Sequence, residues 1–204
     1  MKILKKAVKG EQGYFNYQRF IRTVRTGILF IIPMAAYVAA YLYYGSRQNL
    51  ITVVAMIGLI PACLSAVGIV MVYTVRSVPA KLYREIEPHT GSLTMAYELY
   101  MTNYDKNTLL DAVAVCGETI VALATFKNPD RKQAETHIEN TVRAAGFRAN
   151  ASVLTDPAKF TERLDSMNAH AADLRSGIAA RKDSRYPEET YEEQLLHILM
   201  TASL

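Results

Sequence analysis

Residues 27–45 read GILFIIPMAAYVAAYLYYG and residues 50–75 read LITVVAMIGLIPACLSAVGIVMVYTV, and neither run contains a charged residue. A helix needs about 20 residues to cross a hydrocarbon core about 30 Å thick, so each run is long enough to span a membrane. Buried helices of water-soluble proteins rarely lack charge over such a length. The two runs therefore predict two transmembrane helices.

The short connection between the runs predicts their arrangement. Only residues 46–49 separate them, so the helices are expected to form an antiparallel hairpin. Seven basic residues precede the first run, and Arg76, Lys81 and Arg84 follow the second, whereas the connection contains Arg47 alone. Because basic residues concentrate in cytoplasmic segments, we expect a two-pass protein of the cell membrane whose N- and C-termini are both cytoplasmic.

The basic charge of the chain is concentrated before the first run. Residues 1–26 contain seven basic residues and one acidic residue, whereas residues 76–204 contain 15 basic and 18 acidic residues. Each Lys or Arg beside an anionic leaflet contributes about 1 kcal/mol of attraction. We therefore interpret residues 1–26 as a basic arm on the anionic inner leaflet, with an interfacial helix over residues 14–26. The residues expected at the membrane surface are Lys5, Lys6, Lys9, Arg19, Arg22 and Arg25.

Small residues recur at helical spacing in both runs, and such rows let two helix backbones approach closely in lipid. Neither run contains an ionisable Asp, Glu, Lys, Arg or His, the groups that usually mark an ion path, so a single copy is not expected to conduct ions. An oligomeric pore or a transporter accessory subunit stays open as an alternative. The predicted contact face consists of Ala36, Ala40, Gly58, Ala62 and Ala66.

The remaining chain predicts one α+β domain. Residues 76–91 indicate a stalk or short helix, and residues 93–101 alternate in polarity with the period of a half-buried strand. Two β-branched runs, residues 109–115 and 119–126, are joined by a tight turn and predict a β-hairpin.

A crossover to a fourth strand is expected next. The helical pattern of residues 131–145 begins after Asp130 and ends at Gly146, and residues 147–155 predict the fourth strand. Helices are expected over residues 157–167 and 187–199. The fold class is thus a transmembrane helical hairpin followed by a cytoplasmic mixed-sheet domain, residues 92–204, of αβββαβα order with a helix on one face.

This order, with an Asp entering the second strand and a Lys leaving the third, is similar to the core of restriction-endonuclease-like nucleases. It resembles in particular the nuclease-related domain that is often tethered to membranes. The matching positions are Asp111, Lys127 and Gln133, within about residues 80–167. The resemblance implies a metal-dependent nuclease, in which paired carboxylates hold a divalent cation that activates water.

The chain departs from the family pattern at one position. Thr125 stands two residues before Lys127, where the family has its second carboxylate. Glu118 or Glu98 would substitute if the sheet brought either of them beside Asp111. The negative charge of residues 76–204 also disfavours duplex binding, which depends on Lys and Arg contacts to phosphate.

A binding or scaffolding domain is the leading interpretation. The four histidines lack metal-ligand spacing, and no glycine-rich phosphate loop is present. We expect no cofactor, with a divalent metal only under the nuclease alternative, active or catalytically decayed. The expected partners are the lipid bilayer and either a second copy of the chain or another protein at the cytoplasmic domain, and not nucleic acid.

Overall fold

The computed structural model describes residues 7–45, 50–102, 107–126, 130–176, 178 and 188–203. The chain divides into two compact units. One contains Phe15–Arg76, and the other joins Ala7–Tyr14 to Ser77–Leu204. The second unit is therefore built from both sides of the apolar segment, and it draws in residues that the sequence suggested belong to a membrane-surface arm.

The first unit is a pair of long helices, α1 (Tyr14–Tyr44) and α2 (Leu50–Thr74), each long and apolar enough to cross a membrane. At 1.5 Å per residue they measure ~46 Å and ~37 Å. The structure carries residues 14–26 and the first apolar run in one continuous helix, with no break at the expected end of the interfacial segment. The connection over residues 46–49 lies outside the described residues.

Arginines of α1 bind the C-terminal turns of α2. Arg19 donates to the carbonyl of Val72 (3.3 Å) and to that of Val75, and Arg22 donates to the carbonyl of Gly68 (3.2 Å). Carbonyls at the end of a helix lack intrahelical donors and carry partial negative charge, so the Arg19 guanidinium stabilises the end of α2. Arg19 and Arg22, expected to face lipid headgroups, are thus engaged within the hairpin, while Arg25 is exposed.

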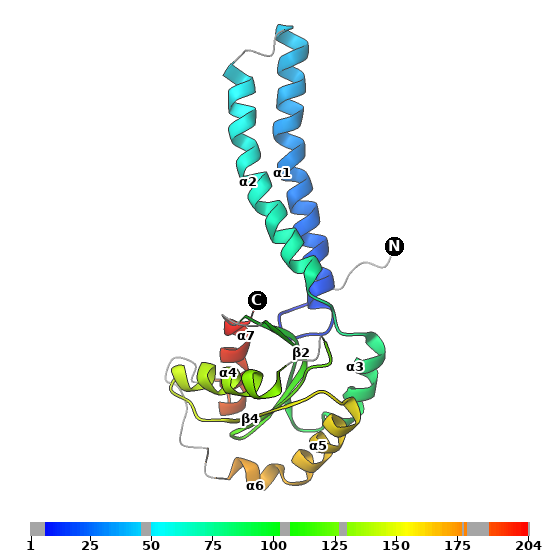
Figure 1. Cartoon of the computed structure of the whole chain (residues 1–204), viewed down its shortest axis with the longest axis vertical. Helices are drawn as coiled ribbons and strands as arrows, with labels where there is room; N and C mark the ends of the chain where they lie inside the picture. Colours follow the sequence, from blue (N-terminus) through cyan, green and yellow to red (C-terminus); the bar gives the residue numbers. More distant parts are fainter. Residues whose placement is uncertain are drawn as a thin grey trace. The chain divides into compact units, whose positions relative to one another are not determined.

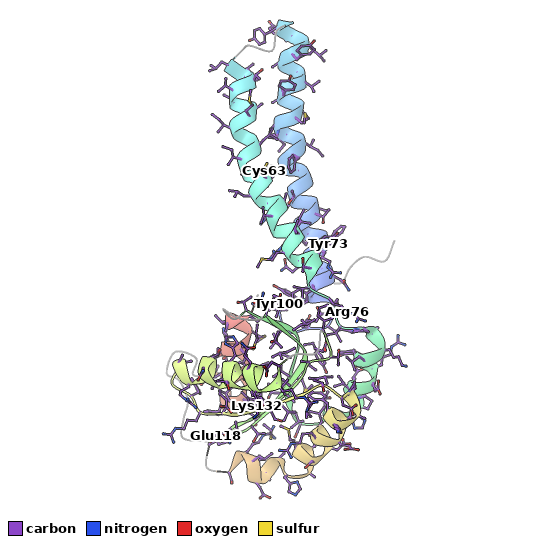
Figure 2. All side chains as sticks on the ribbon, in the orientation of Figure 1. Cys63, Tyr73, Arg76, Tyr100, Glu118 and Lys132 are labelled. Atoms are coloured by element: carbon purple, nitrogen blue, oxygen red, sulfur yellow. The ribbon has the colours of Figure 1, made fainter. Side chains whose placement is uncertain are left out.

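The small-residue face of the hairpin is formed in part as expected. Ala40 and Ala62 are buried, Ala66 is half-buried, and a Cβ added to Gly58 would lie 3.3 Å from the ring of Pro33. Ala36 is exposed instead. Large apolar side chains project outward from both helices (Figure 2), including Ile31, Leu42 and Leu64, which are 66%, 76% and 70% exposed.

The second unit is an α+β domain around a four-stranded mixed sheet, as the sequence predicts (Figure 1). The strands lie in the order β1-β2-β3-β4, with β1 to β3 an antiparallel meander and β4 parallel to β3. Its elements are α3 (Ala80–Ile86), the 3₁₀ turn η1 (Glu87–His89), β1 (Thr94–Met101), β2 (Thr108–Cys116), β3 (Thr119–Leu123), α4 (Arg131–Ala144), β4 (Asn150–Leu154), α5 (Pro157–Ala169), α6 (Ala171–Arg175) and α7 (Tyr191–Ala202).

Helices cover both faces of the sheet, where we expected a helix on one face. On one face, α4 and α7 pack through Ile138, Leu195 and their neighbours. On the other, α5 contributes Phe160 and Leu164, and Ile86 of α3 is fully buried beside them. Residues 77–89, expected to form a stalk, accordingly belong to the domain and contribute the buried side chains of Val78 and Ile86, because both faces of the sheet are apolar and both need cover.

The alternation expected along β1 fails at Glu98. Tyr97 packs in the core beneath α5, but Leu99 joins Ala96 in the core beneath α4 and α7. Glu98 has φ +58°, a left-handed conformation that strands of L-residues avoid. The prediction of one alternating strand was wrong here, because this single backbone torsion turns the following side chains to the opposite face.

Both edges of the sheet have hydrogen-bond partners. The edge of β1 receives residues 7–14, since the Tyr97 N–H donates to the carbonyl of Gly10 (2.8 Å). At β4, the N–H of Val153 donates to Glu135 (2.8 Å) and that of Ala151 to Glu139 (3.2 Å), both on α4. An edge with satisfied N–H groups is a poor template for pairing with another strand.

Two glycines share a positive φ but differ in the space around them, so together they distinguish the cost of the backbone conformation from the cost of a steric clash. Gly117 (φ +61°) would bring an added Cβ to 2.1 Å from the carbonyl oxygen of Leu174, whereas Gly146 (φ +87°) has nothing within 4 Å.

Gly146→Ala should lower the free energy of unfolding by about 1 kcal/mol, the cost of a left-handed residue. Gly117→Ala should cost at least ~2 kcal/mol more, because backbone must move. Urea unfolding of the full chain in mild detergent measures both, and equal losses would contradict the packing around Gly117.

Candidate functional site

Glu98 is a buried carboxylate that binds two distant segments of the chain. It is 1% exposed and accepts hydrogen bonds from the N–H of Gly13 (3.0 Å), the N–H of Val78 (3.0 Å) and the hydroxyl of Ser77. Buried charge is costly unless it is hydrogen-bonded, and these donors supply that compensation. Glu98 therefore holds the segment that leads into α1 and the segment that follows α2 on the same strand.

Asp111 lies opposite Glu98 in the sheet. Tyr97 pairs with Ala112 and Leu99 with Leu110, so the register aligns Glu98 with Asp111. Asp111 is 3% exposed, and its Oδ2 accepts from both the N–H and the hydroxyl of Thr125 at 2.7 Å. Thr125, which stands where the nuclease pattern has an acid, thus donates to Asp111 rather than adding a second carboxylate.

The other residues suggested by the nuclease resemblance do not gather around Asp111 in the described structure. Glu118 lies in the β2–β3 turn, beyond the far end of β2. Gln133 is in the first turn of α4, where its N–H donates to the side chain of Asp130 (3.3 Å). Lys127 lies outside the described residues. Within the described ranges, no three His, Cys, Asp or Glu side chains come close enough to hold a metal ion.

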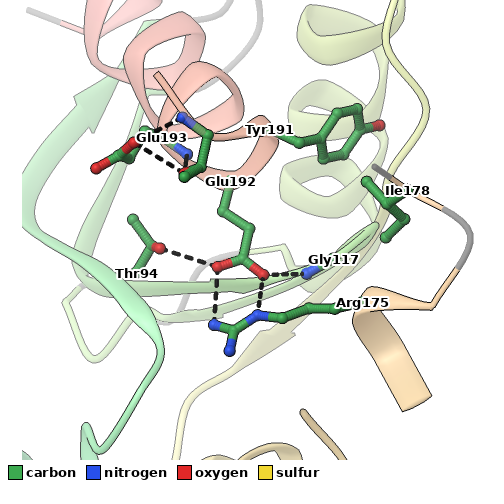
Figure 3. A pocket seen from close by; sticks show the side chains of 8 residues that line it. Thr94, Gly117, Arg175, Ile178, Tyr191, Glu192 and Glu193 are labelled. Carbon is green, nitrogen blue, oxygen red and sulfur yellow. Dashed lines mark hydrogen bonds and ion pairs between the residues drawn. The ribbon is translucent and has the colours of Figure 1, made fainter. Parts of the chain in front are cut away.

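A second polar cluster centres on Glu192, at the start of α7 (Figure 3). Arg175 donates to both carboxylate oxygens, from Nε to Oε1 at 2.7 Å and from Nη2 to Oε2 at 3.0 Å. The N–H of Gly117 adds a bond to Oε1 (2.8 Å), and the hydroxyl of Thr94 adds one to Oε2 (3.0 Å). One carboxylate thereby connects α6, α7, β1 and the β2–β3 turn.

Local sequence explains why these side chains meet. Thr190 caps α7, and its reciprocal bonds with Glu193 form a capping box that fixes the first turn carrying Glu192. Gly117 adopts the left-handed conformation that a tight hairpin turn requires, which directs its N–H to Glu192. Arg175 also donates to the carbonyl of Ser92 (2.7 Å), which fixes the guanidinium.

The cluster shifts the ionisation of its members. Burial raises the pKa of Glu192, but the hydrogen bonds from Arg175, Gly117 and Thr94 outweigh it and leave that pKa below its ordinary value. Hydrogen bonding to Glu192 raises the pKa of Arg175. Burial, with the nearby Glu192 charge, raises the pKa of the Cys116 thiol, so Cys116 is a poor nucleophile.

A cavity of about 440 Å³ opens beside this cluster. Both Glu192 oxygens are occupied by donors, whereas the Arg175 side chain is 39% exposed and presents positive charge to the opening. We did not single out Glu192 or Arg175 from sequence. The glutamates that begin the last helix were visible, but no local pattern connects them to Arg175. The lining residues are Thr94, Gly117, Arg175, Ile178, Thr190, Tyr191, Glu192 and Glu193.

Comparison with protein-family models, with curated proteins and with solved structures yields no match for this chain.

Replacement of Glu192 by Gln tests the energetics of the cluster. At pH 7, Glu192→Gln should lower the free energy of unfolding by about 2–4 kcal/mol, because Arg175 loses its carboxylate partner. A carboxylate whose pKa is lowered on folding stabilises the fold above its unfolded pKa, and this contribution disappears as pH falls through the folded pKa. The difference from wild type should therefore shrink on acidification below about pH 4.3.

Urea unfolding of the full chain between pH 3 and pH 7 measures this difference. The exposed Glu162 supplies the control, because Glu162→Gln should leave stability unchanged. A Glu192→Gln deficit that stayed constant across this pH range would contradict the assignment.

Proposed function

We propose that the chain is an integral membrane protein whose helical hairpin anchors a cytoplasmic α+β domain, and that this domain serves as a binding or scaffolding module. The observation that supports the membrane anchor is which parts of the chain form the second unit. Residues 7–14 and residues 77 onward build one compact body, although both membrane-length helices lie between them in the chain. Segments that fold together must be on the same side of a bilayer, which requires an even number of crossings.

The surface of the hairpin supports the proposal that lipid surrounds it. Large apolar side chains are exposed along both helices, and contiguous exposed apolar surface of this extent is rare in water-soluble monomers. The excess of basic residues around the hairpin ends favours the cytoplasmic side for the domain.

The domain supports recognition through cavities rather than through strand addition. Both sheet edges have hydrogen-bond partners, Gly10 at β1 and the side chains of Glu135 and Glu139 at β4. In the described part of the second unit, Val8 is the one large hydrophobic residue with an exposed side chain. The described surface of the domain therefore lacks a broad apolar interface, and concave sites between helices are the better candidates for ligand binding.

Cysteine labelling tests the topology. In a Cys63→Ser, Cys116→Ser background, we expect Ser46→Cys in the connection to react with an impermeant maleimide on intact cells. Glu162→Cys on the exposed face of α5 should react only after permeabilisation. The reverse pattern would put the domain outside the cell. Labelling of both positions in intact cells would contradict a hairpin that spans the membrane.

A metal-dependent nuclease, or its decayed relative, is the second candidate, and one observation favours it. Glu98 and Asp111 stand opposite one another in the register of β1 and β2, and both are buried. Hydrogen-bond donors already contact both carboxylates: Gly13, Ser77 and Val78 for Glu98, and Thr125 for Asp111. A metal would have to displace these donors.

Manganese binding separates the two candidates. With the binding module, Mn²⁺ titration of the full chain in detergent, followed by electron paramagnetic resonance, should give the same weak binding in wild type and in Asp111→Asn. Glu162→Gln controls for surface carboxylates. Tight binding in wild type, weakened more than tenfold by Asp111→Asn alone, would favour the nuclease candidate.

A further inference from the structure

The helices α4 and α7 lie side by side on one face of the sheet (Figure 1). Residues from both helices line a second cavity of about 410 Å³. Its volume is within the range of small-molecule sites, which are mostly apolar with a few polar groups. The walls follow this pattern, because the end of α4 and the outer face of α7 contribute small apolar residues. The lining residues are Thr141, Ala144, Ala145, Phe147, Glu189, Gln194, His197, Ile198, Thr201 and Ala202.

Glu189 gives this cavity its chemical character. The side chain is 32% exposed and its Oε1 lies 3.2 Å from Nδ1 of His197, while its Oε2 is shielded from solvent and has no hydrogen-bond partner among the described residues. A buried carboxylate oxygen without a donor is destabilising, and more so than a neutral oxygen in the same place would be. The site therefore lacks one donor, and a ligand N–H group would supply it.

Two further features of the cavity favour a cation. The C-terminus of α4 borders it at Ala144 and Ala145, and the C-terminal end of a helix carries partial negative charge. The hydroxyl of Thr141 already donates its hydrogen to the carbonyl of His137 (2.8 Å), so toward the cavity this oxygen can act only as an acceptor. The ring of Phe147 lines the apolar part of the cavity and can contact the body of a ligand.

From these observations we infer that the cavity between α4 and α7 binds a small organic ammonium ion with an apolar body. The ammonium group donates to Glu189, and the apolar body packs between Phe147, Ile198 and Ala144. This inference rests on the proposed binding function and names a ligand class for it. The site is distinct from the Glu192 cluster, whose carboxylate already has its full set of donors.

Benzylammonium is the probe, and benzyl alcohol is its neutral counterpart of the same shape. Titration of the ¹⁵N-labelled full chain in a neutral detergent should give saturable amide shifts at Phe147, His197 and Ile198 with benzylammonium. Benzyl alcohol should bind at least tenfold more weakly. Equal affinity for the two probes, or no saturable shift with either, would overturn the inference.

Three variants test the placement. Glu189→Gln keeps the shape of the side chain and should weaken benzylammonium binding at least tenfold without changing benzyl alcohol binding. Glu188→Gln removes the same charge from the adjacent, exposed residue and should have no effect. Ala144→Leu fills the cavity and should abolish binding of both probes. Unchanged benzylammonium affinity in Glu189→Gln or in Ala144→Leu would refute the assignment.

Carbonate extraction of membranes that contain the chain tests the membrane anchor separately from ligand binding. If no probe binds while the chain stays in the membrane fraction, the ligand assignment fails and the membrane anchor stands. If carbonate releases the chain, the proposed function itself fails.

Discussion

The hydrogen bonds accepted by Glu98 are the interaction on which the architecture depends. A carboxylate that is 1% exposed must be satisfied, and its donors come from Gly13 on one side of the hairpin and from Ser77 and Val78 on the other. Satisfying this one carboxylate joins the residues that precede the apolar segment to the residues that follow it, within one domain. The same residue takes a left-handed backbone conformation, and that turn distributes the side chains of β1 between the two cores.

Local patterns were sufficient to predict most elements. The two uncharged runs, the alternation in the strands and the N-caps Asp130 and Asp156 each depend on residues close in sequence, and the helices and the mixed sheet follow them. The boundaries moved by a few residues: the third strand ends at Leu123, before the expected Phe126, because the chain leaves the sheet to bring Thr125 to Asp111. Periodicity reports which residues are buried, and it does not report where such a departure begins.

The features that sequence reasoning missed all depend on contacts between distant residues. Lys9 was expected at lipid headgroups, but it donates to the carbonyl of Ser203 (2.7 Å), and burial lowers its pKa. Arg175 and Glu192 form a paired charge through α6 and α7, which no spacing in the sequence links. The nuclease resemblance drew attention to Asp111, which the structure buries, while its hydroxyl partner, Thr125, was read as a missing ligand. A polar residue gains its role from its neighbours in space, which a one-dimensional pattern does not contain.

The position of residues 7–14 on the edge of β1 has a consequence for biosynthesis. The ribosome makes this segment before β1, and the strand whose amide it accepts appears only after both apolar helices have emerged. The segment must therefore remain unpaired while α1, α2 and the residues up to β1 are synthesised, and it joins the sheet afterwards. Folding of the domain is consequently not vectorial, and the complete sheet forms only after both long helices have been made.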